Sequence, residues 1–162
     1  MSSNFRAAKA MQGEVSGEGM RFGVVCGRFN DLITNRLLDG VSNGFGVHGV
    51  KEADVTVVWV PGAFEIPITA KTMADTGNYD AVVTLGAVIR GDTPHFDYVA
   101  GECARGIQDA QLSTGIPIVF GVLTTESLDQ ALERSNEKDN KGEESARTAI
   151  EMVDLLRKLR TS

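Results

Sequence analysis

The sequence is poor in the side chains that bind transition metals. It contains two cysteines and two histidines among its 162 residues, and they form no CxxC or clustered Cys/His motif. Zinc sites need three or four such ligands, usually at short spacings, so we expect no metal site and no cofactor. Cys26 and Cys103 are isolated thiols, and the apolar run around Cys26 favours a buried thiol over a ligand or a disulfide.

Basic clusters and long apolar runs are missing as well. The chain has 16 Lys and Arg against 22 Asp and Glu, a net charge of −6, and no Lys/Arg run marks a nucleic-acid-binding surface. No apolar stretch approaches the roughly 20 residues of a membrane-spanning helix, and residues 1–20 lack the apolar core of a signal peptide. We therefore expect no nucleic-acid partner, no membrane partner and a cytoplasmic location.

Repeats and low-complexity tracts are also absent from the sequence. The length of 162 residues suits a single domain over 1–162, and a chain of this size buries roughly two thirds of its unfolded surface. Residues 1–10 are mostly polar or small, and we expect them to be flexible.

The apolar residues that are present alternate between two patterns. Continuous apolar runs, without the polar alternation of a half-exposed strand, predict strands over 20–27, 55–60, 81–88 and 118–123. Apolar residues that recur every three or four positions predict helices over 32–45, 66–73, 96–112, 127–134 and 146–159. We expect the strand over 55–60 to be buried on both sides, with Trp59 in the core.

The alternation of strands and helices predicts the fold class. Four continuous apolar strands separated by helices predict an α/β fold, a doubly wound four-stranded parallel sheet with helices on both faces. This is a flavodoxin-like, three-layer arrangement, in which ligands bind at the carboxyl ends of the strands. The segments that follow the four strands are 27–30, 61–65, 86–95 and 124–126.

Three of these segments carry the residue types of a ligand site. Phe29 and Phe64 fall in turns instead of on an apolar face, so they are placed to stack on a flat ring. The segment 86–95 leaves a strand, breaks at Gly91 and reaches His95 just before a helical pattern. Backbone N–H groups at a helix N-terminus can bind an anion, and a histidine can transfer protons near neutral pH. The alternative is an ordinary strand-to-helix turn with a surface histidine.

Four motifs, in this order, resemble those of the lumazine synthases. They are GRFN at 27–30, VPGAFEIP at 60–67, GAVIRGDTPHFDYV at 86–99 and FGVLTTE at 120–126, and the likeness runs from about residue 11 to residue 150. The resemblance implies an enzyme of the penultimate step of riboflavin biosynthesis. That step condenses 5-amino-6-ribitylamino-2,4-pyrimidinedione with 3,4-dihydroxy-2-butanone 4-phosphate to 6,7-dimethyl-8-ribityllumazine, with release of phosphate and water.

The resemblance also implies roles for individual residues. His95 would transfer protons, and Phe29 would stack on the pyrimidine ring. The residues that would contact the ring edge and the ribityl chain are Ala63, Phe64, Glu65, Ala87, Val88, Ile89 and, from an adjacent subunit, Phe120. The residues that would bind phosphate are Gly91, Asp92, Thr93 and, from the adjacent subunit, Arg134, with Lys138 and Lys141 as candidates for a further contact.

The chemistry of the reaction calls for the same residue types. Imine formation, phosphate elimination and ring closure each move a proton, and one positioned histidine can contribute about 10²–10⁴-fold to such steps. An arginine matches phosphate in a bidentate manner, and no step requires redox chemistry or a metal. The alternatives are a non-catalytic protein that binds flavin or lumazine and a shell protein on the same fold. Neither would have a use for His95 and Arg134.

One segment departs from the family pattern. From Arg134 to Gly142 the chain is one residue shorter and poorer in glycine than is common, which leaves open whether Lys138 or Lys141 contacts phosphate. The resemblance implies a homo-oligomer, a pentamer or an assembly of pentamers, with active sites at subunit interfaces and riboflavin synthase as a further partner. Residues 11–15 resemble the strand that the family adds to a neighbour's sheet edge. The shortening bears on assembly size more than on catalysis.

Overall fold

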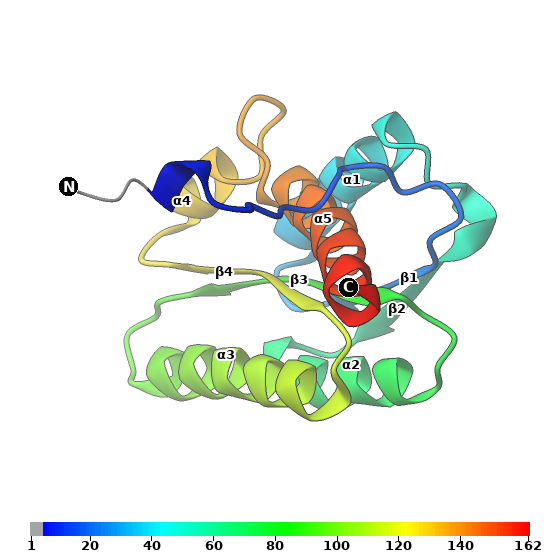
Figure 1. Cartoon of the computed structure of the whole chain (residues 1–162). Helices are drawn as coiled ribbons and strands as arrows, with labels where there is room; N and C mark the ends of the chain where they lie inside the picture. Colours follow the sequence, from blue (N-terminus) through cyan, green and yellow to red (C-terminus); the bar gives the residue numbers. More distant parts are fainter. Residues whose placement is uncertain (1–4) are drawn as a thin grey trace.

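A four-stranded parallel sheet forms the centre of the molecule (Figure 1). The computed structural model describes residues 5–162, so the flexibility predicted for residues 1–4 lies outside the described residues. All pairings are parallel, and the order is β2-β1-β3-β4. The predicted α/β fold is thereby confirmed. The strands are β1 (Phe22–Gly27), β2 (Val55–Val60), β3 (Ala81–Ile89) and β4 (Ile118–Thr125).

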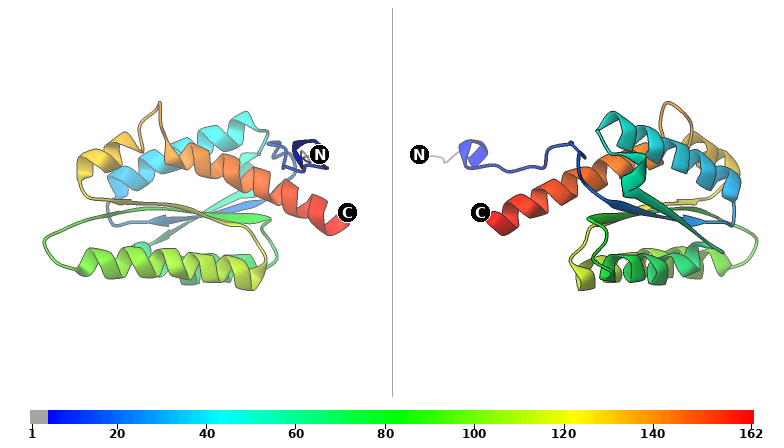
Figure 2. Two further views of the ribbon diagram at one scale, coloured as in Figure 1. Left: turned by 60° about the vertical axis from the view of Figure 1, so that its left-hand side comes forward. Right: turned by 90° about the vertical axis from the view of Figure 1, so that its right-hand side faces the viewer.

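Helices cover both faces of the sheet, as predicted (Figures 1 and 2). One face carries α1 (Asp31–Val47), α5 (Lys141–Thr161) and the short α4 (Leu128–Glu133), and the other carries α2 (Ile66–Asp75) and α3 (His95–Thr114). No helix within residues 5–162 is long and apolar enough to cross a membrane. Short 3-10 helices are formed by Phe5–Ala7, Glu52–Asp54 and Ala63–Glu65.

Each face of the sheet has its own apolar core, because the side chains of a strand alternate between the two faces. In β1, Phe22 and Val24 contribute to the core under α1 and α5, while Val25 contributes to the core over α2 and α3. The ring of Phe22 stacks on Phe45 of α1, with centroids 4.4 Å apart. A central strand covered on both faces needs apolar residues at every position, which is why its sequence shows no polar alternation.

Strand β2 is not buried on both sides, and this prediction is wrong. It lies at the edge of the sheet and pairs only with β1. Val57 is 41% exposed and Trp59 is 37% exposed, so Trp59 is not a core residue of the chain. An apolar run identifies a strand, but it does not state how many neighbours the strand has.

Helix α5 begins at Lys141, earlier than the predicted start at residue 146. Asn140 caps it: Oδ1 accepts a hydrogen bond of 2.8 Å from the N–H of Gly142. The Nδ2 of the same side chain donates to the carbonyl oxygens of Arg36, at 3.0 Å, and Ser135, at 3.2 Å. Asn140 therefore joins α1, the end of α4 and the start of α5. Because the first turn of α5 is polar, apolar periodicity alone does not reveal that the helix begins at Lys141.

Replacing Asn140 by alanine is expected to lower the thermal stability of the protein. The substitution removes an N-cap and leaves two carbonyl groups without their donor, a loss of about 1–3 kcal/mol. For a domain of this size we expect a Tm lower by roughly 3–10 °C in a calorimetric melt. The matched control is Asn43→Ala at an exposed position of α1. Equal melting temperatures for the two variants would contradict the capping role.

The N-terminal segment runs across α5 before it enters β1 (Figure 1). Residues 11–15 join no strand of their own chain within the described residues. The N–H of Glu14 donates to Oδ2 of Asp154 at 2.8 Å, and the N–H of Gly17 donates to the carbonyl of His48 at 2.7 Å. Pairing of this segment with the sheet of a neighbouring subunit stays a prediction.

Candidate active site

The loops after β1, β2 and β3 surround a cavity of about 700 Å³, a size typical of small-molecule sites. It lies at the end of the sheet where β3 leads into the loop before α3 (Figure 1). Asp92, predicted at the phosphate position, does not line it. The predicted residues that do line it are Phe29, Ala63, Phe64, Glu65, Ala87, Val88, Ile89, Gly91, Thr93 and His95.

Exposed aromatic rings stand at this cavity, among them the two predicted phenylalanines and Tyr98. Phe29 is 74% exposed and Phe64 is 59% exposed, although large apolar side chains are usually buried. Their loops are joined through the backbone: Arg28 N–H donates to Val60 O at 2.8 Å, and Phe29 N–H donates to Pro61 O at 3.0 Å. The rings are therefore held at the cavity by paired loops, available to a flat ligand.

Strand β3 extends past β1 at the cavity. Pairing between them ends at Cys26 and Leu85, whereas pairing of β3 with β4 continues to Ile89 and Thr125. Residues 86–89 thus have a backbone edge on the β1 side that no strand of the chain covers. Such an edge presents N–H and C=O groups in a fixed row, which suits the polar edge of a planar ring.

Asn30 is a residue of the site that the sequence interpretation missed. It has φ of 62°, in the left-handed region, which Asn adopts more readily than most residues. Its Nδ2 donates to the carbonyl of Ala87 at 2.9 Å and so ties the β1 turn to the free edge of β3. The sequence does contain a signal for this residue: in the GRFN motif, an amide side chain stands between a predicted strand and a predicted helix.

His95 is the first residue of α3 and not, as predicted, the residue before the helix. Its side chain is exposed and lines the cavity. The N-cap is Pro94, whose side chain cannot accept a hydrogen bond, and the N–H of His95 donates to Oγ1 of Thr93 at 3.4 Å. The positive end of a helix favours an anion. Gly91 and Thr93 line the same cavity. A histidine and the turn before a helix therefore meet at one place.

Phe120 and Arg134 lie on a different surface of the chain. They line a second concavity of about 440 Å³ between β4, α4 and α5. Phe120 stands on the edge strand β4 and is 44% exposed. Nη1 of Arg134 donates to the carbonyl of Gln130 at 3.0 Å and lies 3.8 Å from Oε2 of Glu133, with which it forms an ion pair. The chain thus presents the two predicted parts of the site on separate surfaces.

The two candidate lysines differ in placement. Lys141 lines the concavity of Arg134 and forms an ion pair of 2.9 Å with Glu144. That hydrogen bond raises the pKa of Lys141 above its ordinary value. Lys138 is exposed in the loop between α4 and α5 and lines neither concavity. Of the two, Lys141 is the better placed to act with Arg134.

Cys26 is buried, as predicted, and Cys103 is buried as well; burial raises the pKa of both to about 12. Thiols with such pKa values are poor nucleophiles and poor metal ligands at neutral pH. Across residues 5–162 the structure holds no cluster of three or more His, Cys, Asp or Glu side chains suited to a metal ion.

A parallel three-layer α/β sheet with a ligand-sized cavity at its carboxyl edge is typical of enzymes that act on small molecules. The model of the 6,7-dimethyl-8-ribityllumazine synthase family matches residues 19–157. The chain belongs to this family of transferases of riboflavin biosynthesis.

Proposed function

We propose that the protein condenses 5-amino-6-ribitylamino-2,4-pyrimidinedione with 3,4-dihydroxy-2-butanone 4-phosphate, and that it does so at sites shared between adjacent subunits of a homo-oligomer. The pyrimidine ring stacks on Phe29, with its polar edge on residues 86–89. The ribityl hydroxyls lie along 63–65, where Glu65 accepts hydrogen bonds. The phosphate lies at the start of α3, and Phe120 and Arg134 of a neighbour complete the site.

The observation that carries this proposal is the grouping of residues in the 700 Å³ cavity. A stacking ring, a strand edge and a histidine at a helix start line this cavity together, and each matches a different part of the two substrates. Phe120 and Arg134 lie on a separate concavity. This separation supports the proposal that a second subunit brings Arg134 to the phosphate.

The proposed reaction needs positioned proton transfer more than covalent catalysis. The 5-amino group adds to the substrate ketone, and loss of water forms an imine. A proton is removed from the adjacent hydroxyl-bearing carbon as phosphate leaves the terminal carbon, and the resulting enol tautomerises to a second carbonyl. The ribitylamino nitrogen then closes the ring onto the second carbonyl, with loss of a second water. His95 accepts and returns these protons, and holding two small substrates together supplies much of the remaining acceleration.

The direct test mixes the purified protein with both substrates and follows the absorbance of the lumazine product. We expect product to form well above the uncatalysed background. Formation at the background rate would contradict the proposal and favour a non-catalytic flavin-binding or shell protein, because the exposed Phe29 and Phe64 would also suit a flavin ring. Equilibrium binding of riboflavin, measured in parallel, identifies that alternative.

Phe29→Ala is expected to weaken binding of the pyrimidine substrate more than that of the phosphate substrate. A lost stacking contact costs about 1–2 kcal/mol, which corresponds to a roughly five- to thirtyfold higher KM. Phe5→Ala, at another exposed phenylalanine, is the matched control. Steady-state kinetics and a thermal melt are measured together. A lower Tm with both KM values unchanged would show that Phe29 stabilises the fold and does not bind substrate.

A further inference from the structure

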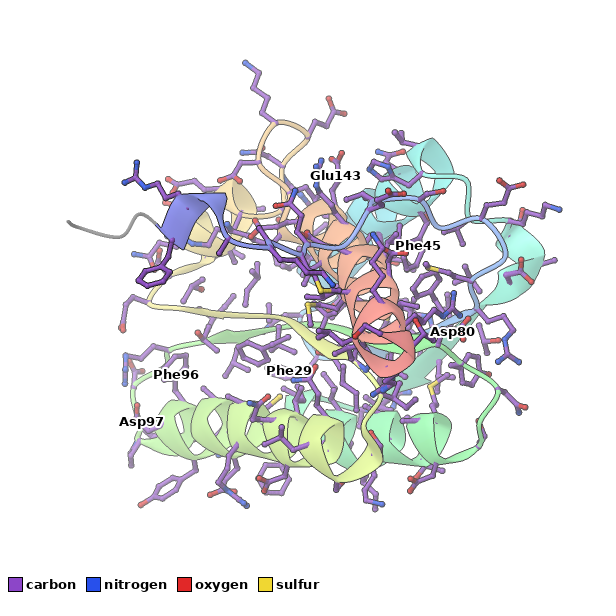
Figure 3. All side chains as sticks on the ribbon, in the orientation of Figure 1. Phe29, Phe45, Asp80, Phe96, Asp97 and Glu143 are labelled. Carbon is purple, nitrogen blue, oxygen red and sulfur yellow. The ribbon has the colours of Figure 1, made fainter. Side chains whose placement is uncertain are left out.

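Arg90 joins three elements beside the cavity, between the lining residues Ile89 and Gly91. It directly follows β3, and its N–H donates to the carbonyl of Thr125 at 2.9 Å. Its Nε lies 2.6 Å from Oε2 of Glu126, just after β4, and its Nη1 lies 3.2 Å from Oδ1 of Asp97, in the first turn of α3. The guanidinium also lies over the ring of Phe96, 4.3 Å from its centroid. Figure 3 shows Phe96 and Asp97 at the end of α3 where the loop from β3 arrives.

Stability alone does not account for this cluster. The side chains of Arg90, Asp97 and Glu126 are 38%, 61% and 62% exposed, and ion pairs at such positions contribute about 0–1 kcal/mol to folding. The location is unusual in another respect. Two carboxylates flank residues 91–95, where the proposed function places a phosphate, in a protein whose net charge is −6.

Unpaired carboxylates close to residues 91–95 would repel a bound anion. Asp97 is in the first turn of α3, where it interacts with the same positive helix end that a phosphate would use. Glu126 is held in place by a second contact, since its N–H donates to Oε1 of Gln130 at 2.7 Å. Arg90 reaches both carboxylates and offsets one of their two negative charges. Its own pKa is raised, chiefly by the hydrogen bond to Glu126, so it remains a cation at every working pH.

We propose that Arg90 is a positioning residue that offsets the negative charge of Asp97 and Glu126, so that residues 91–95 accept the substrate phosphate. The inference rests on the proposed function for the identity of the anion. In this role Arg90 does not contact the phosphate itself, because its guanidinium is already paired with the two carboxylates. Its effect on the phosphate is therefore electrostatic and acts through the charge that it offsets.

The test compares three variants. Arg90→Gln removes the cation, Arg90→Lys restores a cation, and the triple variant Arg90→Gln/Asp97→Asn/Glu126→Gln removes the cation together with both anions. Arg105→Gln is the matched control, since Arg105 pairs with Glu102 and Asp109, each at 2.7 Å, on the exposed surface of α3. For each protein we would measure the Kd of inorganic phosphate by calorimetry, the KM of each substrate and the Tm.

Arg90→Gln is expected to raise the phosphate Kd and the KM of the phosphate substrate by roughly five- to twentyfold, the effect of two uncompensated charges close to a partly screened site. The KM of the pyrimidine substrate should change less than twofold. Arg90→Lys should recover much of the loss, and the triple variant should return to within about threefold of wild type. Arg105→Gln should match wild type.

Failure of the triple variant to recover would overturn the inference, because a residue that only braces the loop is not replaced by removing its partners. An equal rise in both KM values, or an unchanged phosphate Kd in Arg90→Gln, would overturn it as well. Phosphate titration does not require turnover. Absence of lumazine formation by wild type, with the predicted order of phosphate Kd values, would therefore reject the proposed function and support the role of Arg90.

Discussion

His95→Ala is expected to lower turnover by about one to three orders of magnitude, because it removes the group proposed to transfer protons in each step. The loss should be partial, since the cavity still holds both substrates together. Folding and assembly should be unaffected, as the side chain is exposed at the start of α3. The measurement is steady-state lumazine formation with both substrates saturating, alongside a thermal melt and size-exclusion chromatography.

The second histidine of the chain supplies the control for this experiment. His48 follows α1, away from the cavity, and is half-buried. His48→Ala should leave kcat close to the wild-type value. A His95→Ala rate within a factor of two of wild type would reject the proton-transfer role and restore the interpretation of His95 as an ordinary surface histidine.

Arg134→Ala is expected to weaken binding of the phosphate substrate by about 1.5–3 kcal/mol, the usual contribution of a charge-assisted hydrogen bond. This corresponds to a KM higher by roughly tenfold to 150-fold, with the pyrimidine KM little changed. Arg147→Ala, at an exposed position of α5, is the matched control. Similar KM values in the two variants would show that Arg134 does not bind the phosphate.

A shared site also predicts that two impaired variants can restore each other's activity, and a subunit-mixing experiment tests this. Subunits with His95→Ala and subunits with Arg134→Ala are dissociated, combined in equal amounts and reassembled. In a randomly assembled ring, about a quarter of the interfaces carry both intact residues, so about a quarter of wild-type activity should return. Activity that never exceeds the mean of the two variants, despite demonstrated subunit exchange, would show that each site belongs to one subunit.

The central strands and the first cavity could be predicted because their signals are local. Continuous apolar runs identify β1 and β3, and a residue in the turn after a parallel strand must lie at the ligand-binding edge. Phe29 and His95 were predicted at the site for this reason, and both line the cavity. The predicted start of α3 was one residue late, a difference that does not move the site.

Other features depend on partners that are distant in sequence. The exposure of β2 follows from strand order, which an apolar run does not encode. The start of α5 depends on the contacts of Asn140 with Arg36 and Ser135. The ion pairs of Arg90 require the turn after β4 to meet the start of α3. In each case the sequence contains the right side chain, but only the fold brings it to its partner.

The extension of β3 past β1 has a consequence for how this site could change during evolution. Residues 86–89 present main-chain groups, which every residue type except proline carries in full. If a ligand ring forms hydrogen bonds with this edge, substitutions at these positions alter the packing beneath the ligand. They leave the main-chain N–H and C=O groups in place. Insertions or deletions in the turn at 27–30 would instead shift β1 against β3 and cover or uncover the edge. Selection for substrate therefore acts on the length of that turn more than on the composition of the strand.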